Sequence, residues 1–384
     1  MIPYRTDHCK FLVDNSECSG GDPMYKRVFG RIAICFVTVI LLLLLIAYGV
    51  MWILVNGPSP TAKNLFVLSV KETSAGGFLA NIFLSEEEIR EIISPSTEFD
   101  GTQDEQDLSM IVVPPTTGDS SSNQSTSTDP VDSQSPEDSS ASGGFTDTPV
   151  DNTDSGIEIV DITGSTYNGK LMIIADPSRV FVGVPDSYGE NSRGLTVAKM
   201  IEKYDCVAGT NAGGFHDPNG QGTGGIPDGI VIYEGELLWG ELDSSYSLAG
   251  LDGDGVLHVG NMTARRALEI GVKYAASYGP ALVINGKSAG GKYGLGGGLN
   301  PRTAIGQRAD GAILLLVING RSVESLGATM DDLASIMLAH GAVNATNLDG
   351  GSSSLMIVDG EYLTTSAYLF GERVVATAIL VKRK

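Results

Sequence analysis

Basic residues are scarce in this chain, and a long central stretch lacks them altogether. The 384 residues include 25 Lys and Arg against 46 Asp and Glu, which gives a formal net charge of −21. No Lys or Arg lies between Arg90 and Lys170, although sixteen acidic residues do. We therefore expect no basic surface for nucleic acid, and most of the excess acidity belongs to one segment.

Cysteine and histidine are also scarce, with four residues of each. The cysteines are Cys9, Cys18, Cys35 and Cys206, and none stands at the CxxC or Cys/His spacing typical of a zinc site. We expect Cys9 and Cys18 to be free cytosolic thiols, with a disulfide between them as the alternative.

One long apolar run stands near the N-terminus. Ile32–Val55 contains 24 residues without a charge, which as a helix is long enough to cross a hydrocarbon core of roughly 30 Å. The basic residues Lys26, Arg27 and Arg31 flank its N-terminal side, which predicts a cytoplasmic N-terminus. A cleaved signal peptide is the alternative, but its apolar run is shorter and ends at an A-x-A-like site. We expect a cytoplasmic tail over residues 1–31 and an uncleaved signal-anchor helix over residues 32–55.

Two further segments separate this run from the C-terminal part of the chain. Residues 56–93 contain a capping-box pair, Ser85 with Glu88, which predicts a short helix in a membrane-proximal stalk. Residues 94–155 are rich in Ser, Thr, Asp and Pro, so they bury too little apolar surface to offset the entropy of ordering. We expect an acidic disordered linker there that holds the following domain away from the bilayer.

Residues 156–384 have the pattern of a globular domain. Short apolar runs between Gly, Asp and Asn turns predict strands at 170–174, 180–184, 206–210, 229–233, 281–284, 303–307, 312–318 and 345–348. A hairpin turn is expected at Ala309-Asp310-Gly311. Thr196 and Thr329 are expected to cap helices over 197–204 and 330–340. The pattern predicts an α+β fold, a mixed β-sheet with a few packed helices, in about 230 residues.

Two of these helix–strand units deliver a polar residue at the end of the strand. Asn211 follows the strand 206–210, and Asp349 follows the strand 345–348. Ligand sites in sheets with parallel strands gather beyond the carboxyl ends of those strands. We therefore expect both side chains on one rim of the domain.

Three loops of small residues each carry a polar side chain suited to an anionic ligand. They are 209–215 with Asn211, 300–306 with Arg302, and 347–354 with Asp349. Glycines let a ligand approach the main chain, and successive amide groups can form an anion cradle. A guanidinium binds phosphate or carboxylate as a planar fork. Each residue also has a structural interpretation, as a turn residue for Asn211 and Asp349 or as an ion-paired strand residue for Arg302.

Other polar residues in or near these loops raise two further possibilities, a serine nucleophile and a metal site. A serine hydrolase is disfavoured because Ser352, Ser353 and Ser354 lack the G-x-S-x-G elbow. No cofactor is expected, although Asp217, Asp228 and Asp349 leave a calcium site open if they converge.

Taken in order, the three loops resemble the phosphodiester glycosidase family, which includes a lysosomal N-acetylglucosaminidase and bacterial exopolysaccharide-biosynthesis-type proteins. The family's R-T-A-I-G is intact at Arg302–Gly306, and its L-D-G-G-x-S-S is present at Leu348–Ser354. Residues 211–215 are similar to its N-G-G-F-F-like loop, and residues 227–235 to its P-x-G-x-x-I-x-x-G-like pattern. Ala212 replaces a glycine of the first loop, and Gly214 stands where an aromatic residue is common.

The resemblance implies a hydrolase that cleaves the glycosidic C–O bond of a sugar-1-phosphodiester. It implies catalytic roles for Asp349, Arg302 and Asn211. The residues it implies as substrate contacts are Gly213, Gly214, His216, Asp217, Thr303, Gly350, Gly351 and Ser352.

The arrangement of anchor, stalk and acidic linker resembles a Gram-positive bacterial subgroup. The expected setting is a single-pass cell-membrane protein whose catalytic domain lies outside and acts in cell-surface or exopolysaccharide metabolism. Its expected partners are the membrane and a sugar-phosphate or glycopolymer substrate. Two alternatives stay open: a non-catalytic cell-wall protein that binds anionic glycopolymers, and a phosphodiesterase that breaks the P–O bond.

Overall fold

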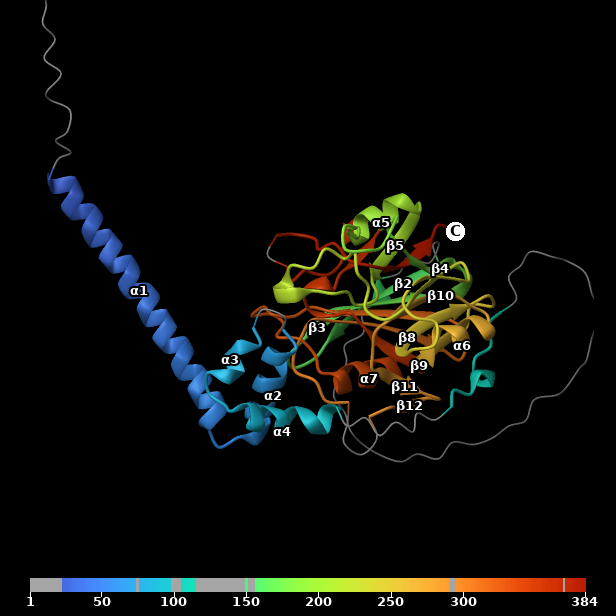
Figure 1. The fold of residues 1–384 in the computed structure, drawn as a ribbon, viewed down its shortest axis with the longest axis horizontal. Helices are drawn as coiled ribbons and strands as arrows, with labels where there is room; N and C mark the ends of the chain where they lie inside the picture. The colour runs from blue at the N-terminus through green and yellow to red at the C-terminus, as the bar shows by residue number, and fades with distance from the viewer. Residues whose placement is uncertain are drawn as a thin grey trace, which may run out of the picture. The chain divides into compact units, whose positions relative to one another are not determined.

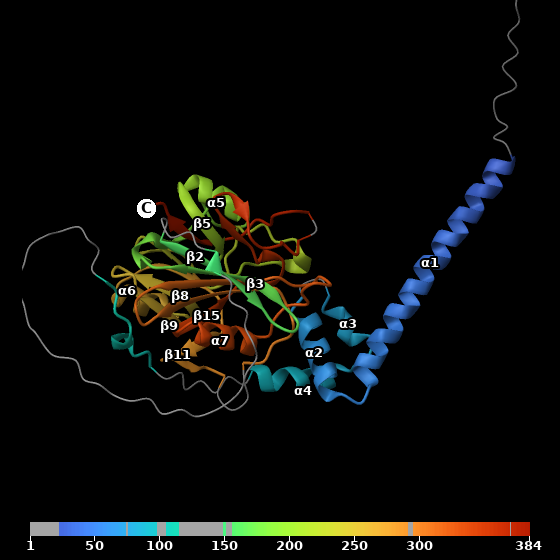
Figure 2. The ribbon, with the colours of Figure 1, turned by 180° about the vertical axis from the view of Figure 1, so that it is seen from behind.

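The computed structural model describes residues 23–73, 76–97, 105–114, 149–150, 156–290, 295–368 and 370–384. The chain divides into two compact units, Met1–Lys63 and Asn64–Lys384. The first unit contains α1 (Pro23–Asn56) and the start of α2 (Pro60–Lys71). The rest of α2 and all later described elements belong to the second unit. Figures 1 and 2 show these elements from the front and from behind.

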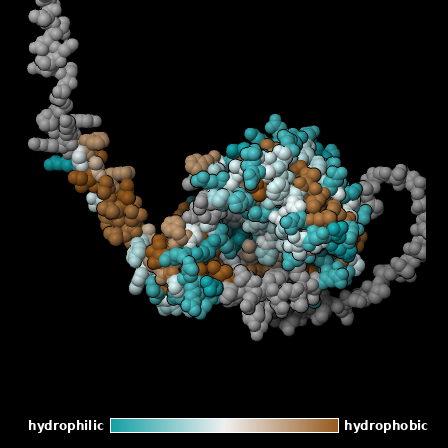
Figure 3. Space-filling view, viewed as in Figure 1, coloured by the Kyte–Doolittle hydropathy of each residue, from teal (hydrophilic) through white to brown (hydrophobic). Residues whose placement is uncertain are grey.

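Helix α1 carries the apolar run. Among the described residues, Val28–Asn56 is the one helix that is long and apolar enough to cross a membrane. Its large apolar side chains are exposed, as the brown surface of Figure 3 shows. The helix predicted over 32–55 is thus present and begins earlier, at Pro23. Its direction across a membrane stays a prediction, and residues 1–22, with Cys9 and Cys18, lie outside the described residues.

The described residues of the second unit form three β-sheets. The largest sheet has the order β1 (Pro149–Val150), β2 (Ile157–Thr163), β3 (Asn168–Ile174), β14 (Ile313–Ile318), β13 (Arg302–Arg308), β15 (Ala342–Leu348), β11 (Ala281–Ile284), β12 (Lys287–Ser288). The second has the order β7 (Glu236–Trp239), β6 (Val231–Tyr233), β10 (Val272–Ser277), β8 (Ser245–Asp252), β9 (Leu257–Thr263). The third has the order β17 (Glu361–Tyr362), β16 (Met356–Val358), β5 (Cys206–Asn211), β18 (Ala378–Lys382), β4 (Val180–Gly183).

Short helices complete the unit. The α-helices are α3 (Phe78–Asn81), α4 (Glu86–Thr97), α5 (Val197–Lys203), α6 (Ala264–Glu269) and α7 (Met330–Ala339). Single 3-10 turns lie at Leu108–Met110, Pro177–Arg179, Pro218–Gly220 and Gly351–Ser353.

The large sheet is covered on both faces, and β14 shows why. Its residues Ile313, Leu315 and Val317 pack in the core shared with strands of the other two sheets. Its residues Leu314, Leu316 and Ile318 pack in a second core with α7. Successive side chains of a strand point to opposite faces, so a strand that is apolar throughout needs cover on both sides.

Local capping signals locate the helices correctly. The Thr329 hydroxyl accepts from the amide of Asp332, and the Asp332 carboxylate accepts from the amide of Thr329, which starts α7. Ser85 and Glu88 make the same reciprocal pair at the start of α4. These capping boxes satisfy amide groups that a helix leaves unpaired at its first turn.

The α+β class is confirmed, but every strand pairing that the described residues form is antiparallel. Strands β13 and β14 form the predicted hairpin, with Gln307 opposite Ile313. The argument from parallel strands for a common rim does not apply, because β5 and β15 lie in different sheets.

Much of the membrane-proximal segment packs in the second unit. From Asn64 onward it belongs to the same unit as the predicted catalytic domain. Val67 is fully buried, and the Ser69 hydroxyl accepts a hydrogen bond of 2.9 Å from the amide of Leu299. Most of the predicted linker lies outside the described residues. The described residues on both of its sides belong to one unit, and its role as a tether stays a prediction.

Candidate active site

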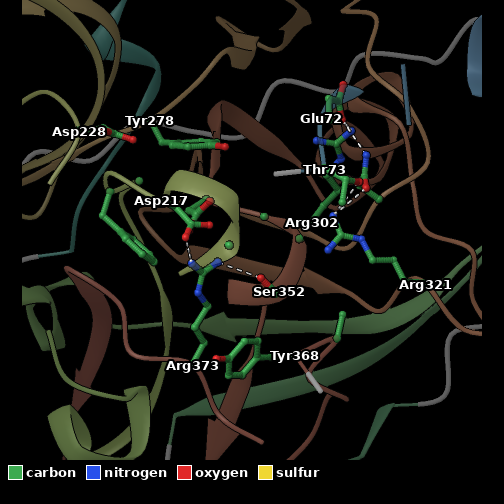
Figure 4. A pocket seen from close by; sticks show the side chains of 18 of the residues that line it. Glu72, Thr73, Asp217, Asp228, Tyr278, Arg302, Arg321, Ser352, Tyr368 and Arg373 are labelled. Atoms are coloured by element: carbon green, nitrogen blue, oxygen red, sulfur yellow. Dashed lines mark hydrogen bonds and ion pairs between the residues drawn. The ribbon is translucent and has the colours of Figure 1, made fainter. Parts of the chain in front are cut away.

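A cavity of about 700 Å³ opens where the three predicted loops meet. This volume lies within the range of small-molecule sites, roughly 300–1,000 Å³. In Figure 4, Glu72, Thr73, Arg302 and Arg321 lie on one side of it, and Asp217, Ser352 and Arg373 lie together on another. The charged residues that line the cavity are Glu72, Asp217, Asp228, Arg302, Arg321, Asp349 and Arg373.

The ends of β5 and β15 meet directly, although they belong to different sheets. The amide of Asp349 donates to the carbonyl of Ala212 at 2.8 Å, and the Asn211 side-chain amide donates to the carbonyl of Asp349 at 2.6 Å. Strand β13 runs beside β15 with Thr303 opposite Leu348, which brings Arg302 to the same edge. Asn211, Arg302 and Asp349 therefore converge as predicted. They are brought together by hydrogen bonds between the ends of β5 and β15 and by the pairing of β13 with β15, and not by parallel strands of one sheet.

Asn211 holds this junction together and does not line the cavity. It is fully buried, and its side-chain oxygen accepts from the Thr303 hydroxyl at 2.8 Å and from the amide of Leu355 at 3.2 Å. Its side-chain nitrogen donates to the carbonyl of Asp349. Asn211 and the equally buried Thr303 therefore lie behind the cavity lining, and the predicted catalytic role of Asn211 and substrate contact of Thr303 stay predictions.

Asp349 lines the cavity with a partly buried side chain. Burial raises the pKa of its carboxyl from 3.8 to about 6, and the positive charge of Arg373 opposes part of this rise. A carboxyl with such a pKa is mostly ionised at neutral pH yet basic enough to accept a proton from water. Its chemistry is therefore that of a general base or an electrostatic stabiliser.

The glycines after Asp349 permit close approach of the main chain, as predicted. A side-chain methylene at Gly350 would stand 2.8 Å from the carbonyl oxygen of Pro301. Gly351 has a φ of +61°, a conformation that favours glycine. Its amide donates to the Pro301 carbonyl at 2.8 Å, so that group is unavailable to an anion. The predicted amide cradle over 350–352 is correspondingly reduced, although Gly350, Gly351 and Ser352 all line the cavity.

Arg373 anchors the first predicted loop, and sequence reasoning did not find it. Its side chain is 8% exposed and forms an ion pair with Asp217. It also donates to the Ser352 hydroxyl at 2.9 Å and lies 4.8 Å from the centre of the Phe215 ring. Asp217 and Ser352 line the cavity as predicted, joined through this guanidinium.

Three further predicted substrate contacts, Gly213, Gly214 and His216, lie in or next to the first loop and differ in whether they line the cavity. Gly214 lines the cavity, where a larger residue would stand 2.8 Å from the Tyr278 ring. Gly213 is buried and donates its amide to the Thr377 hydroxyl at 2.8 Å. His216 is exposed and does not belong to the cavity lining. Gly214 therefore lines the cavity and Gly213 and His216 do not, while their predicted contacts with substrate stay predictions.

Arg302 is almost fully buried and ion-paired. Its guanidinium donates to the Glu72 carboxylate at 2.6 Å and to the carbonyls of Gly298 at 2.7 Å and Ala328 at 3.1 Å. Arg302 is thus ion-paired, as its structural interpretation expects, and it also lines the cavity, while its catalytic role stays a prediction.

Arg321 is a second guanidinium on the same side of the cavity as Arg302, and the sequence motifs did not single it out. It is exposed, and in the described part of the chain it forms no ion pair. It donates to neutral acceptors, the Asn300 side-chain oxygen at 3.2 Å and the Thr73 hydroxyl at 3.4 Å. Desolvation by the surrounding protein, together with the nearby charge of Arg302, lowers the pKa of Arg321. A guanidinium stays protonated at neutral pH, so this residue offers positive charge to an anion.

In the described part of the chain, carboxylates do not cluster in the way a metal site requires. Asp217, Asp228 and Asp349 all line the cavity, as the calcium alternative needs. Within the residues that the structure describes, no group of three or more His, Cys, Asp or Glu is placed to hold a metal ion.

The comparisons with known proteins agree with the motifs. Residues 204–382 match the family model of phosphodiester glycosidases. The SPbeta prophage-derived uncharacterized protein YomE of Bacillus subtilis is 33% identical over 192 residues, which span 46% of this chain and 28% of that protein. The N-acetylglucosamine-1-phosphodiester alpha-N-acetylglucosaminidase of Bos taurus is 24% identical over 212 residues, which span 50% of this chain and 39% of that protein.

A solved structure is also similar. It is the catalytic domain of zebrafish N-acetylglucosamine-1-phosphodiester alpha-N-acetylglucosaminidase, auto-inhibited by its pro-peptide, with 21% identity and a TM-score of 0.49. The match covers 60% of this chain and 83% of that one. The similarity to the curated relatives spans well under half of their length. On the family match over residues 204–382 and the motifs within it, this part of the chain is a domain of the phosphodiester glycosidase family.

Proposed function

We propose that this protein is a membrane-anchored extracellular hydrolase that cleaves the glycosidic C–O bond of a sugar-1-phosphodiester. Membership of its domain in the phosphodiester glycosidase family supports a hydrolase of this general type. The observation that carries the proposal is the placement of Asp349, with its pKa raised to about 6, in the same cavity as Arg302 and Arg321. A basic carboxylate facing positive charge suits a neutral sugar linked to an anion.

The reaction needs one activated water molecule and a leaving group that departs with its electron pair. Asp349 takes a proton from water, whose oxygen forms the new bond to the anomeric carbon of the sugar. The bond between that carbon and the phosphate oxygen breaks, and its electron pair stays on the phosphate. The products are a free sugar and a phosphate monoester, and Asp349 then releases its proton to solvent.

The leaving group explains why a single carboxylate is sufficient. Ordinary glycosidases use one acid to protonate a poor leaving oxygen and a second carboxylate at the sugar. A departing phosphate monoester is stable as an anion, so it needs positive charge more than a proton. Arg321 meets this need because it is exposed and no described carboxylate pairs with it, and Arg302, paired with Glu72, lines the same cavity. Donors already in place for developing charge are the usual source of such stabilisation.

The cavity also has a lining suited to a sugar. Tyr278 and Tyr368 line it together with the Asp217–Arg373 pair. Aromatic rings with polar edges offer a face to the C–H groups of a sugar and hydrogen bonds to its hydroxyls. The name of the bovine relative includes N-acetylglucosamine, which makes that sugar the first to test.

We further propose that the protein acts at the cell surface, in cell-wall or exopolysaccharide metabolism. Helix α1 supports the anchor by its length and apolar composition. The basic residues before it support a cytoplasmic N-terminus and an external domain.

The test is a product assay on the full chain in detergent, with N-acetylglucosamine-1-(methyl phosphodiester) and UDP-N-acetylglucosamine as probes. Release of N-acetylglucosamine by the wild type and loss of about two or more orders of magnitude in Asp349→Asn are expected. Asp254→Asn, at an exposed turn, is the matched control and should keep its rate. Binding of a probe without any product would favour the alternative of a non-catalytic glycopolymer-binding protein.

A further inference from the structure

Residues Ser69–Thr73, which we call the wall segment, pack against the cavity although they precede the predicted linker. Both carboxylate oxygens of Glu72 are used there. One accepts from the amide of Gly298 at 3.0 Å, and the other accepts from Arg302 at 2.6 Å and from the Asn300 side chain at 2.8 Å. Glu72 and Thr73 both line the cavity. The segment thus supplies part of the site.

The facing loop is shaped to receive this segment. A side-chain methylene at Gly298 would stand 2.2 Å from the backbone nitrogen of Ser69, a distance that no packed side chain tolerates. The neighbouring amide of Leu299 donates to the Ser69 hydroxyl at 2.9 Å. Backbone therefore meets backbone at Gly298, and such close approach is a common reason for a glycine in a loop.

The segment bounds the cavity and leaves it open. About 700 Å³ remains with Glu72 in place, which is room for a sugar phosphate. None of the hydrogen bonds among the described residues joins the wall segment to Asp349. The Glu72 carboxylate is directed to the loop 298–302, as Figure 4 shows for its contact with Arg302. The wall segment therefore borders the cavity and does not fill it.

We propose that the wall segment is a lasting component of the active site and that Glu72 is the positioning residue that holds Arg302 in it. Arg302 is buried, with its side chain 7% exposed, so without Glu72 its charge lacks its carboxylate partner. The guanidinium and the loop 298–302 then lose the arrangement in which they face the leaving phosphate. The catalytic unit therefore begins before the acidic linker, at about Asn64. This inference rests on the proposed function for its kinetic readout.

The sharpest test alters the fit without altering charge. Gly298→Ala in the full chain displaces the wall segment, and we expect kcat/KM for N-acetylglucosamine-1-(methyl phosphodiester) to fall about tenfold to a hundredfold. Gly77→Ala is the matched control, because its added methyl group makes ordinary contacts of 3.8 Å or more. It should stay within about twofold of the wild type.

A charge change separates positioning from packing. Glu72→Gln should lower kcat about tenfold or more, even if loss of the negative charge lowers KM, and Glu72→Asp should recover part of kcat. A rise of kcat above wild type in Gly298→Ala or Glu72→Gln would overturn the proposal and identify the segment as a removable mask. Unchanged kcat/KM in Gly298→Ala together with unchanged kcat in Glu72→Gln would refute the positioning role.

Hydrogen exchange keeps the test independent of turnover. The amides of Gly298 and Leu299 donate to the wall segment, so they should exchange slowly in the wild type and fast in Gly298→Ala. If the wild type hydrolyses neither sugar-phosphodiester probe, the proposed function fails, and this exchange pattern still decides whether the wall exists. Fast exchange at both amides in the wild type would refute the wall.

Discussion

Replacing Asp349 by Asn should stabilise the folded protein at neutral pH while it abolishes activity. Burial raises the pKa of Asp349 from 3.8 to about 6, so the ionised carboxylate is less favourable in the folded state than in the unfolded state. A shift of this size corresponds to about 3 kcal/mol of unfolding free energy once the group is ionised in both states. Asn is neutral at every pH, so the variant avoids this cost.

The pH dependence of the difference isolates this effect. A raised carboxyl pKa means that the folded state binds the proton more tightly. The wild type therefore gains stability as pH falls from about 6 to 4 and loses it as pH rises through that range. The advantage of Asp349→Asn should be largest at pH 7–8 and should shrink by about 3 kcal/mol by pH 4. Effects of the amide that do not depend on ionisation cancel in this comparison.

Urea unfolding of the full chain in detergent measures this difference. Trp239, which donates to the Pro227 carbonyl at 2.9 Å, reports on the second unit by its fluorescence. Asp254→Asn, at an exposed turn, controls for the removal of one negative charge. A stability difference between Asp349→Asn and the wild type that stays constant from pH 4 to pH 8 would refute the account of Asp349 as a desolvated carboxylate.

Four further predictions concern the site. The kcat/KM of the wild type should fall about tenfold per pH unit below pH 6, because a pH–rate profile follows protonation of the base Asp349. Arg321→Gln should lower kcat about tenfold or more with a smaller rise in KM, since a charge-assisted hydrogen bond to the developing phosphate charge contributes about 1.5–3 kcal/mol; steady-state kinetics on the methyl phosphodiester measure this. Arg302→Lys should lower turnover by about two orders of magnitude in the same assay, because an ammonium does not reproduce the fork that holds Glu72 and two carbonyls. Asn211→Ala should lower the free energy of unfolding by about 1–3 kcal/mol in urea and reduce kcat as well, because buried partners are left unpaired and Asp349 loses its support.

Features that depend on neighbouring residues are predictable from the sequence. The capping pairs Thr329–Asp332 and Ser85–Glu88 lie three residues apart, and both start helices where expected. The strand β11 (Ala281–Ile284) matches its predicted range because a short apolar run between turns has few alternatives. Such signals are local, so they need no knowledge of the fold.

Features set by long-range pairing are not predictable in the same way. The strands β5 and β15 do not run in parallel within one sheet, yet Asn211 and Asp349 meet through direct hydrogen bonds. The role of Glu72 depends on a contact 230 residues away in the sequence, and nothing around Glu72 signals it. A fragment of residues 156–384, the domain that the sequence suggests for assay, therefore lacks one wall of the proposed site.

The central claim is that the bond broken lies between the sugar and the phosphate oxygen. Hydrolysis of N-acetylglucosamine-1-(methyl phosphodiester) by the full chain in ¹⁸O-labelled water tests it directly, with mass spectrometry of both products. We predict the label at the anomeric hydroxyl of the free sugar and none in methyl phosphate. Label in the phosphate product would contradict the account and assign the cavity to a phosphodiesterase.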